Sequence, residues 1–242
     1  MPIKMDTEVL VKKIIEEIQM GKLVDNDRKL PPEPGLMEHY QVTRYTLRQA
    51  LKQLSEMGYT YQVHGVGTFV RQQQTNDSIS LEYNKGLSAE LARNGRKLTT
   101  EIAHKKIISV SEAEFLPETT HFDKDDKLIE IRRFRSLDDK PYVMEHSYYL
   151  QSVMAEIPDE ALYGSLFQYC EQERKTQIGF IDQTIMSENL PEAATEFMGM
   201  PAKSPCLVVQ DESYLSNGQL LAFSRQYYNY KLGKLFMVKK IH

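Results

Sequence analysis

The sequence predicts an α+β protein in two parts, a mainly helical part followed by a part built on an antiparallel sheet. In the first part, apolar residues recur at i, i+3, i+4 and i+7 from Leu47 to Leu54, the spacing of one helix face. In the second part, turn compositions at Asp138–Pro141 and Asn217-Gly218 separate stretches typical of strands. Helices mixed with antiparallel hairpins are typical of the α+β class.

The totals indicate one large domain or two ordinary ones. The 242 residues are 41% hydrophobic and 26% charged, which is enough apolar content for a sizeable core. The sequence has no signal peptide, no run of about 18 apolar residues, and no C-x-x-C between Cys170 and Cys206. We therefore expect a cytoplasmic protein with reduced thiols, no contact with membranes and no cofactor.

Charge is distributed unevenly along the chain. The net charge is −4, yet residues 1–72 carry 10 Lys+Arg against 9 Asp+Glu, and between His39 and Gln72 four basic residues stand against Glu56 alone. A local basic face on an acidic protein suits a protein that binds DNA and also releases it. A solvated surface patch accounts for the same charges, so charge alone does not decide.

Three helices and a hairpin are expected in the first part. The expected ranges are Thr7–Met20, Pro34–Tyr40 and Arg44–Met57 for the helices, and Tyr59–Val63 and Thr68–Arg71 for the strands. Gly21 and Gly58 end the first and third helices, and the Thr43 hydroxyl caps the third. The glycines of the connection at 64–67 allow a tight hairpin. Helix, helix, turn, helix and two-stranded wing form a winged helix-turn-helix plan.

The third helix has a buried face and a basic face. At about 100° per residue, Arg44, Arg48 and Lys52 lie together beside the apolar stripe, with Tyr45 next to them. Arginines in such a position can form bidentate hydrogen bonds to guanine, whereas hydroxyls suit phosphate oxygens. We expect this helix to enter a groove of double-stranded DNA, although an ordinary amphipathic helix would show the same two faces.

The second part is separated by a polar stretch, which gives a DNA-binding domain at 1–72, a linker at 73–83 and a second domain at 84–242. Helices are expected at Gly86–Asn94, Asp159–Gln172 and Pro191–Met198. Strands are expected at Leu98–Val110, Leu128–Leu137, Tyr142–Leu150, Ile178–Met186, Cys206–Leu215, Gln219–Tyr228 and Leu235–Ile241.

From Leu30 to Val70 the chain resembles the winged-helix domain of the GntR family of bacterial transcription regulators. The matching segments are Leu30-Pro31, Glu33, VTRYTLRQAL at 42–51, Leu54, Gly58 and HGVGTFV at 64–70. The resemblance implies a recognition helix in the major groove, a wing tip in the minor groove, and DNA contacts by Thr43, Arg44, Tyr45, Thr46, Arg48, His64 and Gly65. The family often has Arg where this chain has Pro34, so one contact is missing.

The second half resembles the UTRA effector-binding domain of the HutC-type branch of that family, which has a chorismate lyase-like fold. The matching segments are residues 131–150, 162–166 and 221–230. By resemblance to members that sense sugar phosphates, Ser88, Arg133, Arg135 and Ser165 would hold an anionic group, and Glu145, Phe167 and Tyr228 would face the organic part. Relatives that bind hexosamine phosphates have Glu where this chain has Ala222, which makes an amino sugar less suitable as the effector.

Strand alternation supports an anion site independently. Ile129, Ile131, Arg133 and Arg135 share one face of their strand, so an apolar face becomes basic toward its end. Two guanidiniums can bind a phosphate or carboxylate there. If the turn centres near Asp139, Glu145 lies across from Arg133, and a plain cross-strand salt bridge is the alternative.

Enzymatic chemistry finds little support in the motifs. The six histidines have no metal-ligand spacing, and G-x-S-x-G and phosphate-binding glycine loops are missing. Glu145 and His146 are adjacent in a strand and point to opposite faces, so we expect His146 at the surface.

The sequence favours a homodimeric repressor released from its operator by a small anionic metabolite, with sugar phosphate preferred. The alternatives are a second domain that is a chorismate lyase-like enzyme, or one that only dimerises.

Overall fold

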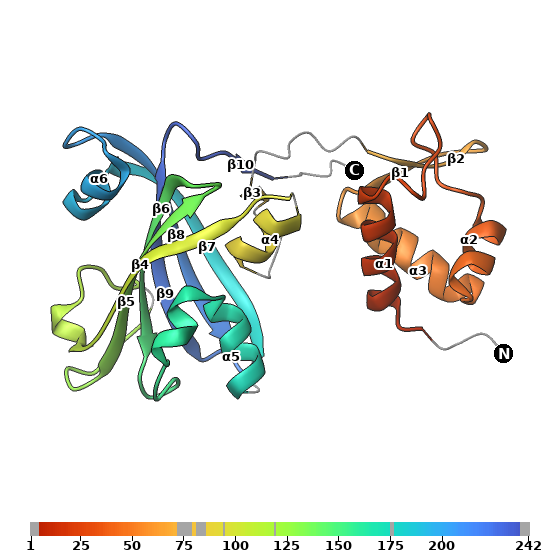
Figure 1. Ribbon diagram of the computed structural model, residues 1–242. Coiled ribbons are helices and arrows are strands. Elements are labelled where there is room, and N and C mark those ends of the chain that lie inside the picture. Colours follow the sequence, from red (N-terminus) through yellow and green to blue (C-terminus); the bar gives the residue numbers. More distant parts are fainter. Residues whose placement is uncertain are drawn as a thin grey trace. The chain divides into compact units, whose positions relative to one another are not determined.

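The structure is a computed structural model that describes residues 5–71, 79–80, 86–93, 95–118, 120–174 and 177–237 (Figure 1). Its contacts divide the chain into two compact units, one containing residues 5–71 and the other residues 79–236. The first unit is helical with a short hairpin, and the second is built on an antiparallel sheet. The expected α+β class is therefore confirmed.

The first unit has the expected order of elements. They are α1 (Thr7–Gln19), α2 (Glu33–Tyr40), α3 (Arg44–Glu56), β1 (Thr60–Val63) and β2 (Gly67–Val70). Leu10 and Ile14 of α1 and Leu47 and Leu54 of α3 are fully buried, so the helical apolar stripes form the core as predicted. The two strands pair antiparallel as a wing.

The second unit contains a six-stranded antiparallel sheet with the order β4-β5-β6-β9-β8-β7. Its strands are β4 (Leu98–Ser109), β5 (Lys127–Leu137), β6 (Lys140–Leu150), β7 (Ile178–Asn189), β8 (Pro205–Leu215) and β9 (Leu220–Asn229). Its helices are α4 (Leu87–Arg93), α5 (Leu166–Arg174) and α6 (Glu192–Met198), with 3-10 turns η1 (Val110–Glu112) and η2 (Asp159–Tyr163). The short strands β3 (Ile79–Ser80) and β10 (Leu235–Phe236) pair in parallel.

Both faces of this sheet are covered. On one face, Leu91 of α4, Leu162 of η2 and Leu166 of α5 pack on apolar strand residues. On the other face, α6 packs through Ala194, and Phe115 from the segment that follows η1 joins the cluster around β6 and β9. Because both faces are buried, polar strand residues on either face are enclosed within the protein.

Three expected ranges differ from the structure. The predicted helix at Asp159–Gln172 is interrupted, with η2 ending at Tyr163 and α5 beginning at Leu166. The predicted linker at 73–83 lies mostly outside the described residues, but its residues Ile79 and Ser80 form a strand. Of the predicted final strand, Leu235 and Phe236 form β10 and Met237 does not belong to it, while residues 238–241 lie outside the described range.

None of the helices in the described ranges is both long enough and apolar enough to cross a membrane.

Candidate functional site

The outer face of α3 presents the side chains that the sequence predicts for DNA contact. Thr43 caps the helix, because its Oγ1 accepts a hydrogen bond from the Thr46 amide at 3.2 Å. Tyr45 is 74% exposed, and the side chains of Arg44 and Arg48 are 64% and 63% exposed. Since the opposite face of α3 is packed into the core, this polar face is held on a rigid element.

The wing tip is formed by the predicted glycine-containing turn. Pairing from Thr60↔Val70 to Val63↔Gly67 leaves residues 64–66 as the connection, so His64 and Gly65 lie at the tip. Gly65 has a φ of +74°, which glycine adopts without strain, and open space surrounds the position of its missing Cβ. A backbone without a side chain at this point can approach a DNA groove closely.

Glu33 is a member of this surface to which the sequence assigned no role. Its two carboxylate oxygens each accept from Arg48 Nε at 3.2 Å, and one lies 3.8 Å from Arg44 Nε. Fifteen residues separate Glu33 from Arg48 in the chain. The contact depends on the packing of α2 against α3, so no local sequence pattern could reveal it.

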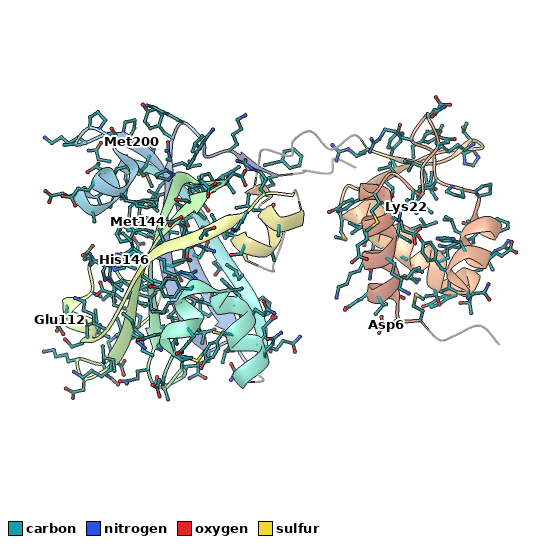
Figure 2. The ribbon with its side chains drawn as sticks, viewed as in Figure 1. Asp6, Lys22, Glu112, Met144, His146 and Met200 are labelled. Atoms are coloured by element: carbon teal, nitrogen blue, oxygen red, sulfur yellow. The ribbon has the colours of Figure 1, made fainter. Side chains whose placement is uncertain are left out.

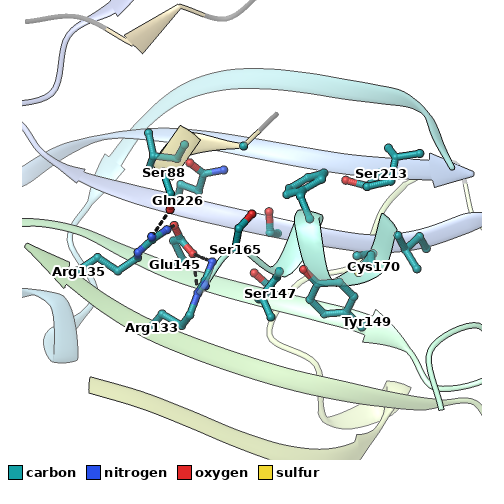
Figure 3. A pocket seen from close by; sticks show the side chains of 18 residues that line it. Ser88, Arg133, Arg135, Glu145, Ser147, Tyr149, Ser165, Cys170, Ser213 and Gln226 are labelled. Carbon is teal, nitrogen blue, oxygen red and sulfur yellow. Dashed lines mark hydrogen bonds and ion pairs between the residues drawn. The ribbon is translucent and has the colours of Figure 1, made fainter. Parts of the chain in front are cut away.

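A cavity of about 60 Å³ lies on the sheet face that α4 and α5 cover (Figure 3). Six of the seven expected effector residues line it: Ser88, Arg133, Arg135, Glu145, Ser165 and Phe167. The charged side chains gather at one end together with Ser88 and Gln226, and Tyr149, Cys170 and Ser213 lie at the other end. The cavity thus has a cationic end and a less polar end.

The sheet register explains how distant residues meet at the cationic end. Asp138 and Asp139 have φ of 48° and 63°, the left-handed values of a two-residue hairpin turn, and they set the pairing of β5 with β6. Arg133 consequently stands opposite Glu145, as predicted, and Glu145 stands opposite Gln226 on β9. These three side chains therefore share one row across three strands.

The break between η2 and α5 completes the Arg133 site. Arg133 Nη1 donates to the Gly164 carbonyl at 2.9 Å and to the Leu162 carbonyl at 3.3 Å, and its Nε donates to Glu145 at 2.8 Å. Ser165 starts α5, because its hydroxyl accepts from the Gln168 amide at 3.2 Å. An unbroken helix would use these carbonyls internally, so the interruption that sequence periodicity missed supplies the guanidinium's partners.

Arg135 has the less complete set of partners. Its Nη1 donates to Glu145 at 2.6 Å and its Nη2 to the Ser88 hydroxyl at 2.5 Å. Its buried Nε has no hydrogen-bond partner among the described residues. One carboxylate is thus shared by two buried guanidiniums, so this triad of side chains carries a charge of +1, and Arg135 Nε is an unused donor beside the cavity.

Glu145 remains ionised in this environment. Burial by itself would raise the pKa of Glu145, but Arg133 and Arg135 outweigh it and hold the pKa at about 2. The salt bridge that the sequence offered as an alternative to a pocket is therefore present, and it forms part of the cavity wall.

Tyr228 does not line the cavity, unlike the other expected effector residues. It lies opposite Val143 and packs with Tyr142 in the cluster beneath α4, with ring centroids 5.5 Å apart. Its hydroxyl donates to the Gln226 side chain at 2.5 Å. Tyr228 therefore supports a lining residue from behind, because the sheet register places it one row beyond Glu145.

Sequence reasoning missed several polar lining residues on the strands. These are Ser147, Ser213, Ser224 and Gln226. Ser147 shares the Glu145 face by simple alternation, and Ser224 pairs with it across β6 and β9. Strand alternation could therefore have predicted Ser147 as a lining residue from the sequence. Ala222 also lines the cavity and offers it no carboxylate.

A buried carboxyl, Asp211, lies just behind this lining. It accepts from the Gln226 amide at 2.7 Å and from the Gln183 amide at 2.9 Å. Burial, opposed by the Gln183 amide and reinforced by the Glu145 charge, raises the pKa of Asp211 to about 6. Asp211 and Tyr228 together fix the orientation of the Gln226 amide.

His146 is buried, so the prediction of a surface histidine is wrong. Figure 2 labels His146 among the strands of the second unit. His146 points to the opposite sheet face from Glu145, as alternation requires, but that face is covered there by Phe115. Its Nε2 lies 2.8 Å from Glu130 Oε1. Burial and the Arg132 charge lower the pKa of His146, against the opposing effect of Glu130.

The same cluster has the spacing of a metal site without the matching chemistry. Glu114, Glu130 and His146 bring ligand atoms within 4.8 Å of one another. However, Glu130 already pairs with Arg132 at 2.8 Å and with Lys106 at 3.0 Å. Arg132 also pairs with Glu114, so these cations neutralise both carboxylates, and the group is explained as an ion-pair network around the buried side chains of Glu130 and His146.

Comparison with known proteins identifies both units. Residues 7–70 match the model of the gntR family of bacterial regulatory proteins, and residues 93–231 match the model of the UTRA domain. The chain is 28% identical over 224 residues to the HTH-type transcriptional regulator YydK of Bacillus subtilis, covering 91% of this chain and 90% of YydK. The crystal structure of YydK has a TM-score of 0.80, with 25% identity over 98% of this chain and all of that one.

Two further relatives are named as repressors. The mannosyl-D-glycerate transport/metabolism system repressor MngR of Escherichia coli is 24% identical over 91% of this chain and 90% of its own length. The transcriptional repressor NagR of Bacillus subtilis is 22% identical over 90% of this chain and 88% of its own length. With both family models matched in sequence order, the chain belongs to the GntR family of bacterial transcription regulators and carries a UTRA domain.

Proposed function

We propose that the protein is a homodimeric repressor that a small anionic metabolite releases from its operator. In this proposal residues 1–72 bind DNA and residues 84–242 hold the effector and the dimer contacts. The observation that carries it is the cavity whose wall contains two buried guanidiniums and one carboxylate. An anion placed there gains charge-assisted hydrogen bonds and offsets the excess positive charge.

The chemistry of the lining favours phosphate or carboxylate as the effector's charged group. Arg135 Nε has no protein partner within the described chain, and Ser88 and Ser165 add hydroxyls at the same cavity. Hydroxyls from Ser147, Ser213 and Ser224 extend along the strands, which suits a polyol such as a sugar. The names of MngR and NagR as repressors support the proposed sign of regulation.

Cavity size connects binding to a change of conformation. About 60 Å³ is room for roughly four to six water molecules, so a phosphate group fits, and in this proposal an attached sugar binds a wider form of the cavity. A ligand that binds only a widened form has different affinities for two states of the domain, which is what an allosteric effector needs.

The two alternatives are less well supported. A domain that only dimerises predicts a filled core behind Arg133, whereas a cavity lies there. A chorismate lyase-like enzyme needs an acid or base near its reacting atoms, and Glu145 at a pKa of about 2 is a weak base and no acid at neutral pH. Turnover of a bound anion would favour the enzyme.

The test has two steps. Thermal unfolding of the whole chain is first measured with inorganic phosphate and a panel of sugar phosphates, because a ligand of the folded state raises the midpoint. Operator binding is then measured with and without the anions that bind. We expect weaker DNA binding with a bound anion; unchanged DNA affinity with every anion would refute the effector role.

A substitution in α3 tests the DNA-binding assignment separately. Arg44→Ala should lower the preference for the operator over a scrambled duplex by roughly tenfold or more, because a bidentate guanine contact contributes about 1–3 kcal/mol of discrimination. An Arg44→Ala protein that keeps the full preference would show that α3 does not read the bases.

A further inference from the structure

Glu33 links the two arginines that are expected to read DNA. It lies in the first turn of α2, and its side chain is 29% exposed. Both of its oxygens lie 3.2 Å from Arg48 Nε, and one lies 3.8 Å from Arg44 Nε. A single carboxylate is therefore shared by two otherwise exposed guanidiniums on the face of α3.

The atom that Glu33 contacts matters for how Arg48 can meet a base. A guanidinium has an edge formed by its two terminal nitrogens and a side formed by Nε and one terminal nitrogen. Glu33 occupies Nε, and among the described residues neither terminal nitrogen of Arg48 has a partner. The edge that remains has the two parallel donors that match guanine O6 and N7.

The neighbouring residue leaves the Glu33 charge available for this role. Pro34 follows it, and proline brings neither a charge nor a donor that could compete for the carboxylate. The three side chains of Glu33, Arg44 and Arg48 keep a net charge of +1, so phosphate attraction is reduced but not lost.

We infer that Glu33 is a positioning residue that orients Arg48, and more loosely Arg44, and thereby sets operator specificity. The inference rests on the proposed DNA-binding role of α3. An arginine without this restraint samples many rotamers. Specific binding must fix one rotamer against a base, which costs conformational free energy, whereas non-specific binding leaves the side chain free and does not incur this cost. Glu33 therefore raises specific affinity while its negative charge slightly lowers non-specific affinity.

The experiment compares the full-length wild type with Glu33→Ala and Glu33→Asp. The probes are the duplex that the wild type selects from a random-sequence library and a scrambled duplex of equal length and composition. Glu33→Asp keeps the charge and its favourable place at the start of α2, but it is one methylene shorter and loses the double contact. Glu56→Ala is the matched control, since Glu56 pairs with Lys52 on α3 at 3.7 Å and its loss removes the same charge.

We expect both Glu33 variants to lose roughly 10-fold in the ratio of selected to scrambled affinity, with scrambled affinity unchanged or higher. Glu56→Ala should leave that ratio unchanged. A wild-type ratio in Glu33→Asp would overturn the positioning role, and so would a Glu33→Ala protein that behaves like the control. A wild type without any preferred duplex would overturn the proposed function and this inference together.

Discussion

Removal of the Glu145 charge is the most informative change in the effector cavity. Glu145→Gln leaves Arg133 and Arg135 buried beside a neutral group, with no other carboxylate bonded to either guanidinium among the described residues. The pKa of Glu145 is lowered from 4.5 to about 2, and 1.36 kcal/mol per pKa unit gives about 3 kcal/mol in favour of the ionised form. This agrees with the roughly 3–5 kcal/mol that breaking a buried ion pair costs.

Thermal and chemical unfolding measure this loss. A change of about 3 kcal/mol lowers the midpoint of a unit of this size by roughly 6–12 °C. The difference from the wild type should be complete above pH 4.5 and should disappear as the pH falls through about 2, because the wild-type carboxylate then protonates as well. The exposed Glu171→Gln on α5 is the control and should change stability by less than about 0.5 kcal/mol.

Added inorganic phosphate gives a second test of the Glu145→Gln variant. Inorganic phosphate in the cavity of Glu145→Gln replaces the missing charge, so it should raise the variant's midpoint by more than it raises the wild-type midpoint. A variant as stable as the wild type, or one that phosphate does not stabilise, would refute the assignment of this triad as a charge-excess anion site.

Two further predictions concern the lining and its support. Asp211→Asn should flatten the pH dependence of stability, because the pKa of Asp211 is raised from 3.8 to about 6 in the wild type. Relative to the variant, the wild type should lose about 2 kcal/mol of unfolding free energy as the pH rises from 4 to 7, and parallel pH profiles would contradict this. Ser88→Ala removes a hydroxyl next to Arg135 and should weaken phosphate binding about tenfold. Tyr228→Phe should cost about 1 kcal/mol of unfolding free energy with little loss of phosphate binding. If titration calorimetry shows a larger loss of phosphate affinity for Tyr228→Phe than for Ser88→Ala, Tyr228 belongs to the site.

Local patterns in the sequence predicted a large part of the site. Strand alternation placed Arg133 and Arg135 on one face, and the Asp138-Asp139 turn set the register that brings Glu145 opposite Arg133. These inferences succeed because strand periodicity and hairpin turns are properties of a few consecutive residues.

Long-range contacts decided what the sequence did not predict. The apolar pattern continues across Gly164, so sequence periodicity did not predict the break between η2 and α5. The carbonyl of Gly164 at this break accepts a hydrogen bond from Arg133. Strand alternation correctly turned His146 away from Glu145, but the segment around Phe115, which covers that sheet face, has no regular pattern that would predict the burial. Glu33 meets Arg48 only through the packing of two helices. In each case the partner lies far away in the chain.

In the proposed function, occupancy of the cavity and binding of the operator are coupled. The most direct measurement titrates the strongest anion of the phosphate and sugar-phosphate panel into the free protein and into the protein saturated with operator. Linkage requires the anion to bind the operator complex more weakly, by the same factor by which the anion weakens DNA binding, typically about 5–150-fold. Equal anion affinity in the two titrations would contradict the account.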